Sequence, residues 1–176
     1  RNKNIKISSA QAIKQGISEE GGLFVPDRIP SFTIDEICSM TDMSYNERAF
    51  FVLSKYLTDF SKDQLSYCTN NAYTNEKFSD CKIAPVVELE KGFNILELWH
   101  GPTCAFKDMA LQILPFFLTA SIKITDEDKT VCILVATSGD TGKAALEGFK
   151  NVEGTNILVF YPELGVSNMQ KLQMKT

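Results

Sequence analysis

The spacing of hydrophobic residues changes at about residue 82. Up to that point apolar residues recur at helical spacing between polar ones, for example over residues 50–57. Beyond it, residues 131–136 and 157–160 are nearly unbroken apolar runs rich in β-branched side chains, as expected for strands buried on both faces. The pattern predicts a mainly helical domain with short strands over 1–82 and part of a parallel-sheet α/β domain over 83–176.

Helix starts in the first region are marked by polar residues at capping positions. Ser44 and Glu47, like Ser61 and Gln64, have the spacing of a capping box, in which each side chain accepts a hydrogen bond from the other residue's backbone N–H. Ser8 or Ser9 is also a suitable N-cap. The predicted helices span about 8–16, 33–40, 44–57 and 61–73. Short strands are predicted at 5–7 and 23–25.

The second region alternates strands, glycine-containing turns and helices. Two short strands flank Lys91-Gly92, which predicts a hairpin. An apolar helix is predicted from Met109 to Leu118, with Pro115 inside it, and the run ending at Ala136 passes through a glycine-rich turn into another helix. This order is typical of βαβ units. The predicted strands span 86–89, 95–98, 131–136 and 157–160, and further helices span about 141–149 and begin at 167.

Composition narrows the classes of protein and partner. The chain has 176 residues, 44% hydrophobic and 23% charged, with a net charge of -4. These values indicate a globular protein, and they exclude a basic nucleic-acid-binding surface, while no apolar run is long enough to span a membrane. Five cysteines without Cys-x-x-Cys spacing, together with a single histidine, predict a reducing, cytoplasmic compartment and no structural metal.

Lys107 is the first candidate for chemistry. It stands beside Asp108 at the predicted start of the apolar helix, where the positive end of the helix dipole disfavours an ammonium group by roughly 0.3–1 kcal/mol. A residue that breaks a local rule is a functional candidate, and a lysine amine can condense with an aldehyde to form a Schiff base. The alternative is a surface lysine whose stem lies along the helix.

The second candidate is the turn Thr137-Ser138-Gly139-Asp140-Thr141. It follows an apolar strand and opens a helix, so its backbone N–H groups and hydroxyls predict a cradle for a phosphate or carboxylate. The alternative is an ordinary turn that only caps the helix. A nucleotide-binding P-loop is excluded, because Thr137 occupies its first glycine position and Ala144 its final hydroxyl position.

These segments resemble the threonine synthase family, pyridoxal-phosphate enzymes of the tryptophan-synthase β fold group. The stretch LELWHGPTCAFKDMALQIL contains the family's lysine motif as His100–Asp108, and VATSGDTGKAALEGF contains its S-G-D-T-G motif as Ser138–Gly142. Glu20–Pro26 and Tyr161–Thr176 resemble two further family motifs. The four segments occur in the family's order across the whole chain. The resemblance implies a fold type II α/β protein, with a three-layer PLP domain that is incomplete here.

The resemblance also implies an activity and residue roles. Family members are carbon–oxygen lyases that convert O-phospho-L-homoserine and water to L-threonine and inorganic phosphate. Lys107 would hold pyridoxal 5'-phosphate as a Schiff base and act in catalysis, and Asp140 would lie beside the cofactor. Residues 137–141 (Thr137, Ser138, Gly139, Asp140 and Thr141) would bind the substrate's α-carboxylate, with His100 nearby.

Two alternatives remain open. A related phospho-lyase would keep the lysine and the turn but release a keto acid and ammonia. A non-catalytic module would use the open edge of its short sheet for association. In this fold group the loop that holds the cofactor phosphate lies beyond the region matched here. We therefore expect this chain to be an N-terminal fragment that is inactive by itself.

Overall fold

The computed structural model describes residues 5–175, which form two compact units. The first comprises residues up to 71 together with 116–128, and the second comprises 72–115 together with the residues from 129 onward. Because the units are interleaved along the chain, the domain division expected at residue 82 stays a prediction. Thr176, which ends the last motif, and residues 1–4 lie outside the described residues.

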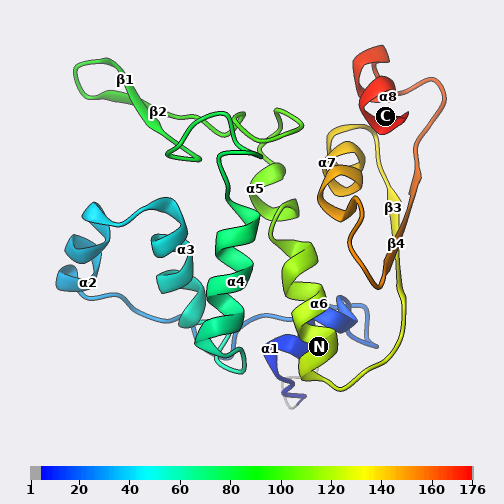
Figure 1. Cartoon of the computed structure of the whole chain (residues 1–176), viewed down its shortest axis with the longest axis horizontal. Coiled ribbons are helices and arrows are strands. Elements are labelled where there is room, and N and C mark those ends of the chain that lie inside the picture. The colour runs from blue at the N-terminus through cyan, green and yellow to red at the C-terminus, as the bar shows by residue number, and fades with distance from the viewer. Residues whose placement is uncertain (1–4, 176) are drawn as a thin grey trace. The chain divides into compact units, whose positions relative to one another are not determined.

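The first unit is helical, as the capping pattern predicts (Figure 1). Capping boxes with both reciprocal hydrogen bonds open three of its helices through Ser8, Thr33 and Ser44, and Ser61 forms the same pair of bonds with Gln64. Its helices are α1 (Ser9–Gln15), α2 (Ile34–Ser39), the short 3-10 helix η1 (Met40–Asp42), α3 (Tyr45–Ser54), α4 (Lys62–Ala72) and most of α6 (Leu114–Ile124).

Aromatic side chains hold the core of this unit together. Phe60 packs edge-on against Phe117 with 5.9 Å between ring centroids, and Tyr67 meets Phe116 in the same way at 6.0 Å. Phe60 and Phe117 are buried, so their contact packs α6 against a residue far away in the sequence, whereas Tyr67 stays 61% exposed. The apolar residues that recur at helical spacing in this region therefore find their packing partners in the tertiary structure.

The two short strands expected in the first region are absent from the described residues. Residues 5–8 have no regular structure, and the 23–25 segment contributes only an isolated bridge between Ile17 and Leu23. Leu23 and Val25 remain about four-fifths exposed, at 79% and 80%. An extended segment becomes a strand only when a partner pairs its backbone groups, and here no partner strand lies alongside.

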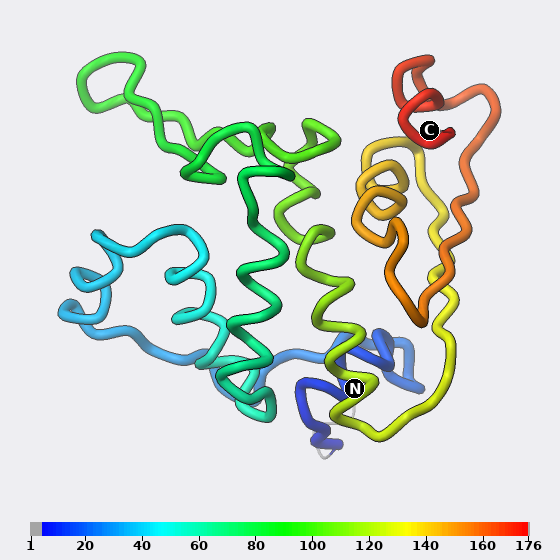
Figure 2. Tube along the Cα trace, viewed as in Figure 1, coloured from blue at the N-terminus to red at the C-terminus, as the bar shows by residue number. Residues whose placement is uncertain are grey.

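The second unit contains a hairpin and a βαβ unit, both as predicted (Figures 1 and 2). The hairpin turns at Lys91-Gly92, where Gly92 adopts φ +81°. In the βαβ unit the strands pair in parallel from Val131–Thr155 to Ala136–Phe160. The elements are β1 (Val86–Glu90), β2 (Phe93–Leu96), α5 (Asp108–Leu111), β3 (Val131–Ala136), α7 (Asp140–Phe149), β4 (Thr155–Phe160) and α8 (Asn168–Lys175).

Only one face of the β3–β4 sheet is covered among the described residues. Ala144, Ala145 and Phe149 of α7 are buried, whereas side chains on the opposite face are exposed, such as Leu158 at 54% and Phe160 at 63%. The expectation of strands buried on both faces is therefore wrong for this structure. An unbroken apolar run indicates two apolar faces, but it does not supply the element that covers each of them.

The apolar helix predicted over residues 109–118 is two helices. The first, α5, ends at Leu111, and α6 begins at Leu114, so Pro115 lies in the first turn of α6. A first-turn residue has no partner for its N–H in the helix, so proline is tolerated there. Pro115 thus marks a helix start, which removes the penalty that it would carry in a helix interior.

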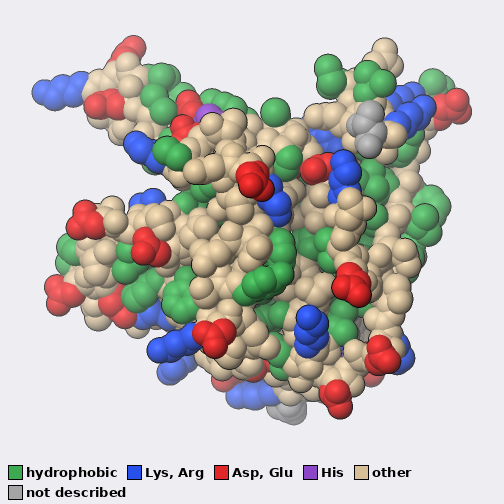
Figure 3. All heavy atoms as spheres, in the orientation of Figure 1, with side chains coloured by type: hydrophobic (Ala, Val, Ile, Leu, Met, Phe, Trp, Pro, Cys, Tyr) green, Lys and Arg blue, Asp and Glu red, His purple; other side chains and the backbone are tan. Residues whose placement is uncertain are grey.

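The visible surface carries charges of both signs. Side chains of both signs are scattered over the face shown in Figure 3, consistent with the small net charge of -4. None of the helices in residues 5–175 is long and apolar enough to cross a membrane.

Candidate functional site

A buried carboxylate fixes the loop that leads into α5. Asp108 is fully buried, and it accepts hydrogen bonds from the Thr103 backbone N–H (2.9 Å) and from Thr103 Oγ1 (2.7 Å). Gly101 passes so close that an added Cβ would lie 2.5 Å from the Asp108 side chain. The glycine, threonine and aspartate of the His100–Asp108 motif therefore hold one loop conformation.

Lys107 follows that loop as the N-cap of α5, as the sequence predicts. Its backbone is already helical, with φ −65° and ψ −22°, and its side chain is half-buried. Lys107 Nζ lies 4.6 Å from the centre of the Phe106 ring, within the range of a cation–π contact. The ammonium group is thus held near the helix start while remaining accessible.

The turn before α7 is ordered by its own threonine. Thr137 Oγ1 accepts hydrogen bonds from the backbone N–H groups of Gly139 and Gly142, each at 3.1 Å. Two groups expected to face a ligand, the Thr137 hydroxyl oxygen and the Gly139 N–H, are therefore already engaged within the turn. Ser138 and Thr141 are exposed, so their hydroxyls are the accessible ones.

Close packing requires both glycines of this turn. A Cβ at Gly139, which has φ +153°, would lie 2.4 Å from Gln170 Nε2. At Gly142 it would lie 2.3 Å from Thr137 Cγ2 and 2.9 Å from Val159 Cγ1. A side chain at Gly142 would displace the turn from β4, whereas at Gly139 it would displace the end of the Gln170 side chain and would also be strained by the positive φ.

Asp140 is the most strongly interacting residue of the turn. Its Oδ1 accepts a hydrogen bond from Gln170 Nε2 at 2.9 Å and lies 3.3 Å from Nζ of the buried Lys143. The Gln170 hydrogen bond lowers the pKa of Asp140, partial burial opposes this, and the positive charges of Lys143 and Lys107 lower it further. Asp140 is therefore a carboxylate at neutral pH.

The influence of Lys107 on Asp140 reflects contact between α5 and α7, which lie side by side in Figure 1. A Cβ on Gly148 of α7 would lie only 2.1 Å from the Leu111 carbonyl oxygen of α5. This close approach brings the two predicted motifs, which are separated by about 30 residues in the sequence, into one electrostatic environment.

His100 lies in the same unit but is held by its neighbours. Its Nε2 lies 2.7 Å from Glu97 Oε2, and its Nδ1 lies 3.1 Å from Ser79 Oγ. The Ser79 N–H also donates to the His100 carbonyl oxygen at 2.9 Å. With both ring nitrogens engaged, His100 braces the loop after β2, and its expected contact with substrate stays a prediction.

Gln170 lies in the Tyr161–Thr176 segment, but the sequence predicts no role for it in the site. The Ser167-x-x-Gln170 spacing is that of a capping box, and both reciprocal hydrogen bonds are present at the start of α8. That spacing is visible in the sequence. The bond from Gln170 to Asp140, 30 residues away, is not.

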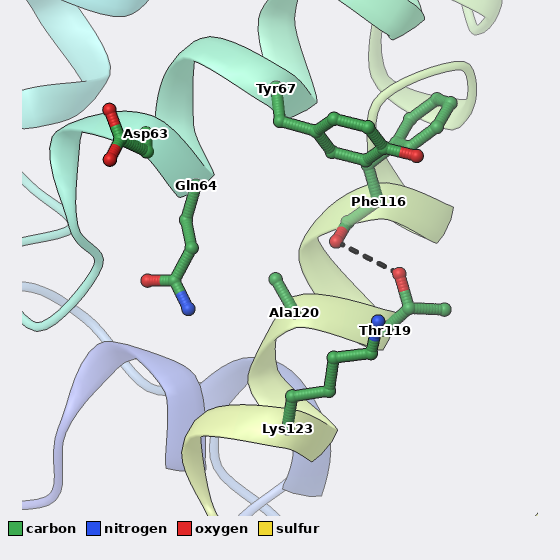
Figure 4. Close-up of a pocket in the computed structure, with 7 residues that line it drawn as sticks. All are labelled: Asp63, Gln64, Tyr67, Phe116, Thr119, Ala120 and Lys123. Carbon is green, nitrogen blue, oxygen red and sulfur yellow. Dashed lines mark hydrogen bonds between the residues drawn. The ribbon is translucent and has the colours of Figure 1, made fainter.

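A separate small cavity of about 280 Å³ lies in the first unit (Figure 4). It contains none of the predicted site residues. The lining residues are Asp63, Gln64, Tyr67, Phe116, Thr119, Ala120 and Lys123. Among residues 5–175 no group of three or more His, Cys, Asp or Glu side chains is placed to hold a metal ion.

Comparison with known proteins points to one family. Residues 1–73 match the family described as threonine synthase N terminus. Threonine synthase from Schizosaccharomyces pombe is 38% identical over 96% of this chain and 34% of its own length. Human threonine synthase-like 1 is also 38% identical, over 94% of this chain and 23% of its own length.

Solved structures extend the similarity to the fold. Yeast threonine synthase superposes with a TM-score of 0.89 and 31% identity, covering 98% of this chain and 36% of the yeast chain. PLP-bound threonine synthase from Brucella melitensis gives a TM-score of 0.87 and 32% identity, covering 96% and 36% of the two chains.

The chain is thus an α/β protein with the fold of PLP-dependent threonine synthases, and it spans about a third of the length of the threonine synthases it matches. Over nearly all of its residues it is related to the N-terminal portion of threonine synthase.

Proposed function

We propose that this chain is the N-terminal portion of a PLP-dependent threonine synthase acting on O-phospho-L-homoserine and water. The observation that carries the proposal is the contact between α5 and α7, which brings the helix capped by Lys107 alongside the helix that begins at Asp140. A lysine and a carboxylate at the starts of adjacent helices fit the amine that would hold the cofactor and the residue expected to lie beside it. The relatives' names point to the same reaction.

Each residue has a role in this proposal. Lys107 Nζ would hold the cofactor and move the substrate's protons, and the carboxylate of Asp140 would lie beside the cofactor. Ser138 and Thr141 would offer their exposed hydroxyls to the substrate's carboxylate, while Thr137 and Gly139 keep the turn in shape. When bound, pyridoxal 5'-phosphate supplies the electron sink for the elimination.

The decisive experiment locates the cofactor on the full-length gene product. Pyridoxal phosphate is added, borohydride reduces the adduct, and mass spectrometry identifies the peptide that carries the pyridoxyl group. We expect the label on Lys107 and its loss in Lys107→Ala. Label on another lysine, or on none, would refute the proposal. The 176-residue chain treated in parallel should stay unlabelled and inactive, because the proposed cofactor site needs residues from beyond it.

A phospho-lyase is the second candidate. It would keep the lysine and the turn, and the relatives at 38% identity carry two different names, threonine synthase and threonine synthase-like 1, so the reaction is tested separately from the family. Product analysis separates the two reactions, since one yields threonine and the other a keto acid with ammonia. The five free cysteines, four of them exposed, support the proposal of a reducing, cytoplasmic location.

A further inference from the structure

Gln170 joins two elements that are distant in the sequence. Its Oε1 accepts a hydrogen bond from the Ser167 backbone N–H (3.1 Å), and its backbone N–H donates to Ser167 Oγ (3.2 Å), which caps α8. Its Nε2 donates to Asp140 Oδ1 at 2.9 Å. One half-buried side chain therefore caps one helix and binds the first residue of another.

The orientation of the amide follows from its partners. Because Ser167 presents a donor, the oxygen of Gln170 must face α8, and the NH₂ group then faces the Asp140 carboxylate. The opposite orientation would place two donors together on one side and two acceptors on the other. Gly139 makes room for this arrangement, since any Cβ there would strike the amide.

We propose that Gln170 is a positioning residue, which holds the Asp140 carboxylate in one orientation at the start of α7. An effect of Gln170 on catalysis rests on the proposed function, whereas its hydrogen bonds to Ser167 and Asp140 do not. Gln170 and Lys143 both contact Oδ1, and no described side chain hydrogen-bonds Oδ2. In the proposed site, the second oxygen would be the one available to a ligand.

The cap of α8 needs only a hydrogen-bond acceptor at position 170. The bond to Asp140 needs a donor, and for that reason the amide is required. A glutamate serves equally well at the third position of a capping box. It has no hydrogen to donate, however, and would bring a second negative charge to Asp140. The charged groups that act on Asp140 in the structure are Lys143 of its own helix and Lys107 beside α5, and these would be shared between two carboxylates.

The test is Gln170→Glu in the full-length protein, with Gln64→Glu as the matched control. Gln64 occupies the same position in the capping box of α4, with bonds of 2.8 and 3.2 Å to Ser61, and in Figure 4 its amide points away from the Asp63 carboxylate. Unfolding curves in urea are recorded for the apoprotein from about pH 7 to about pH 5, which needs no cofactor.

We expect Gln170→Glu to be less stable than the unaltered protein near neutral pH and to recover at least half of the loss on acidification. The paired carboxylates repel one another, which raises the pKa of one of them, so protonation relieves the repulsion. Gln64→Glu should show no pH-dependent loss. Equal stability of Gln170→Glu and the unaltered protein at every pH would overturn the proposal and leave Gln170 as a cap only.

Turnover tests the link to the proposed function separately. With cofactor and substrate present, kcat/KM of Gln170→Glu should fall by about tenfold near neutral pH, the fold-change expected for one hydrogen bond to a charged group. The acid limb of its pH profile should also move to higher pH. An unchanged profile would remove the catalytic consequence, and absence of label on Lys107 would count against the proposed function alone.

Discussion

Asp108 shows how one buried side chain sets the geometry of the proposed site. It is fully buried in the first turn of α5, and its two oxygens accept both donors of Thr103. The sequence identifies it only as a suitable first-turn acid. Its second function, fixing the loop that presents Lys107, depends on the fold of that loop.

Asp108→Ala should therefore lower the free energy of unfolding by about 2–4 kcal/mol, because the Thr103 N–H and hydroxyl are left buried without acceptors. Urea denaturation measures this. Asp35→Ala is the matched control, since Asp35 is also a first-turn acid but is exposed at the start of α2. Its loss should stay within about 1 kcal/mol. Equal losses in both variants would mean that only the helix dipole matters.

At the scale of elements, the helix starts of the first unit are well predicted and its strands are not. Both capping boxes expected from the sequence form, at Ser44–Glu47 and Ser61–Gln64, because the residues involved are three apart and meet as soon as the helix begins. Ser8, one of the two expected N-caps, opens α1. The strands expected at 5–7 and 23–25 do not form, since their partners would have to come from elsewhere in the chain.

The contact between α5 and α7 gives a prediction at this scale. Gly148→Ala places a methyl group 2.1 Å from the Leu111 carbonyl oxygen, so the helices must separate. We expect a loss of about 1–3 kcal/mol in unfolding free energy, as for other overpacked contacts, and weaker labelling of Lys107 in the full-length protein.

Gly22→Ala serves as the control for that variant. A Cβ at Gly22 would meet only Ser18 Oγ, at an ordinary 3.5 Å. Its change in stability should stay within about 0.5 kcal/mol. If Gly148→Ala behaved in the same way, the close approach of the two helices would not constrain the site.

At the scale of the whole molecule, the chain carries an apolar sheet face that nothing in the described residues covers. Leu134, Leu158 and Phe160 lie on it, with exposed fractions from 54% to 67%. Large exposed apolar patches bind other apolar surfaces. The isolated 176-residue chain should therefore bind a hydrophobic fluorescent dye and associate as its concentration rises.

Replacing all three residues with threonine should reduce the dye signal by more than half, while stability changes little, because threonine also favours strands. Dye fluorescence and sedimentation velocity measure the two effects. The control is Val159→Thr on the face under α7, where its Cγ1 approaches Gly142. It should destabilise the protein by about 1–3 kcal/mol and leave the dye signal in place. The opposite pattern would mean that the two faces are misassigned.

The sequence by itself determined what depends on neighbouring residues. Capping boxes, the hairpin turn at Gly92, the apolar runs that become β3 and β4, and the helix start at Lys107 can all be recognised from residues within a few positions along the chain. The motifs that resemble threonine synthase can be recognised for the same reason, because each consists of residues close together in the sequence. Comparison with solved structures confirms the family fold that they implied.

Only the tertiary structure decided which of these pieces act together. It brings Gln170 onto Asp140 across 30 residues, lets Lys107 influence the same carboxylate, and engages both nitrogens of His100. It also leaves one face of the sheet exposed. Such contacts join segments that are distant in the sequence, and their formation depends on how whole elements pack, which no local pattern of residues encodes.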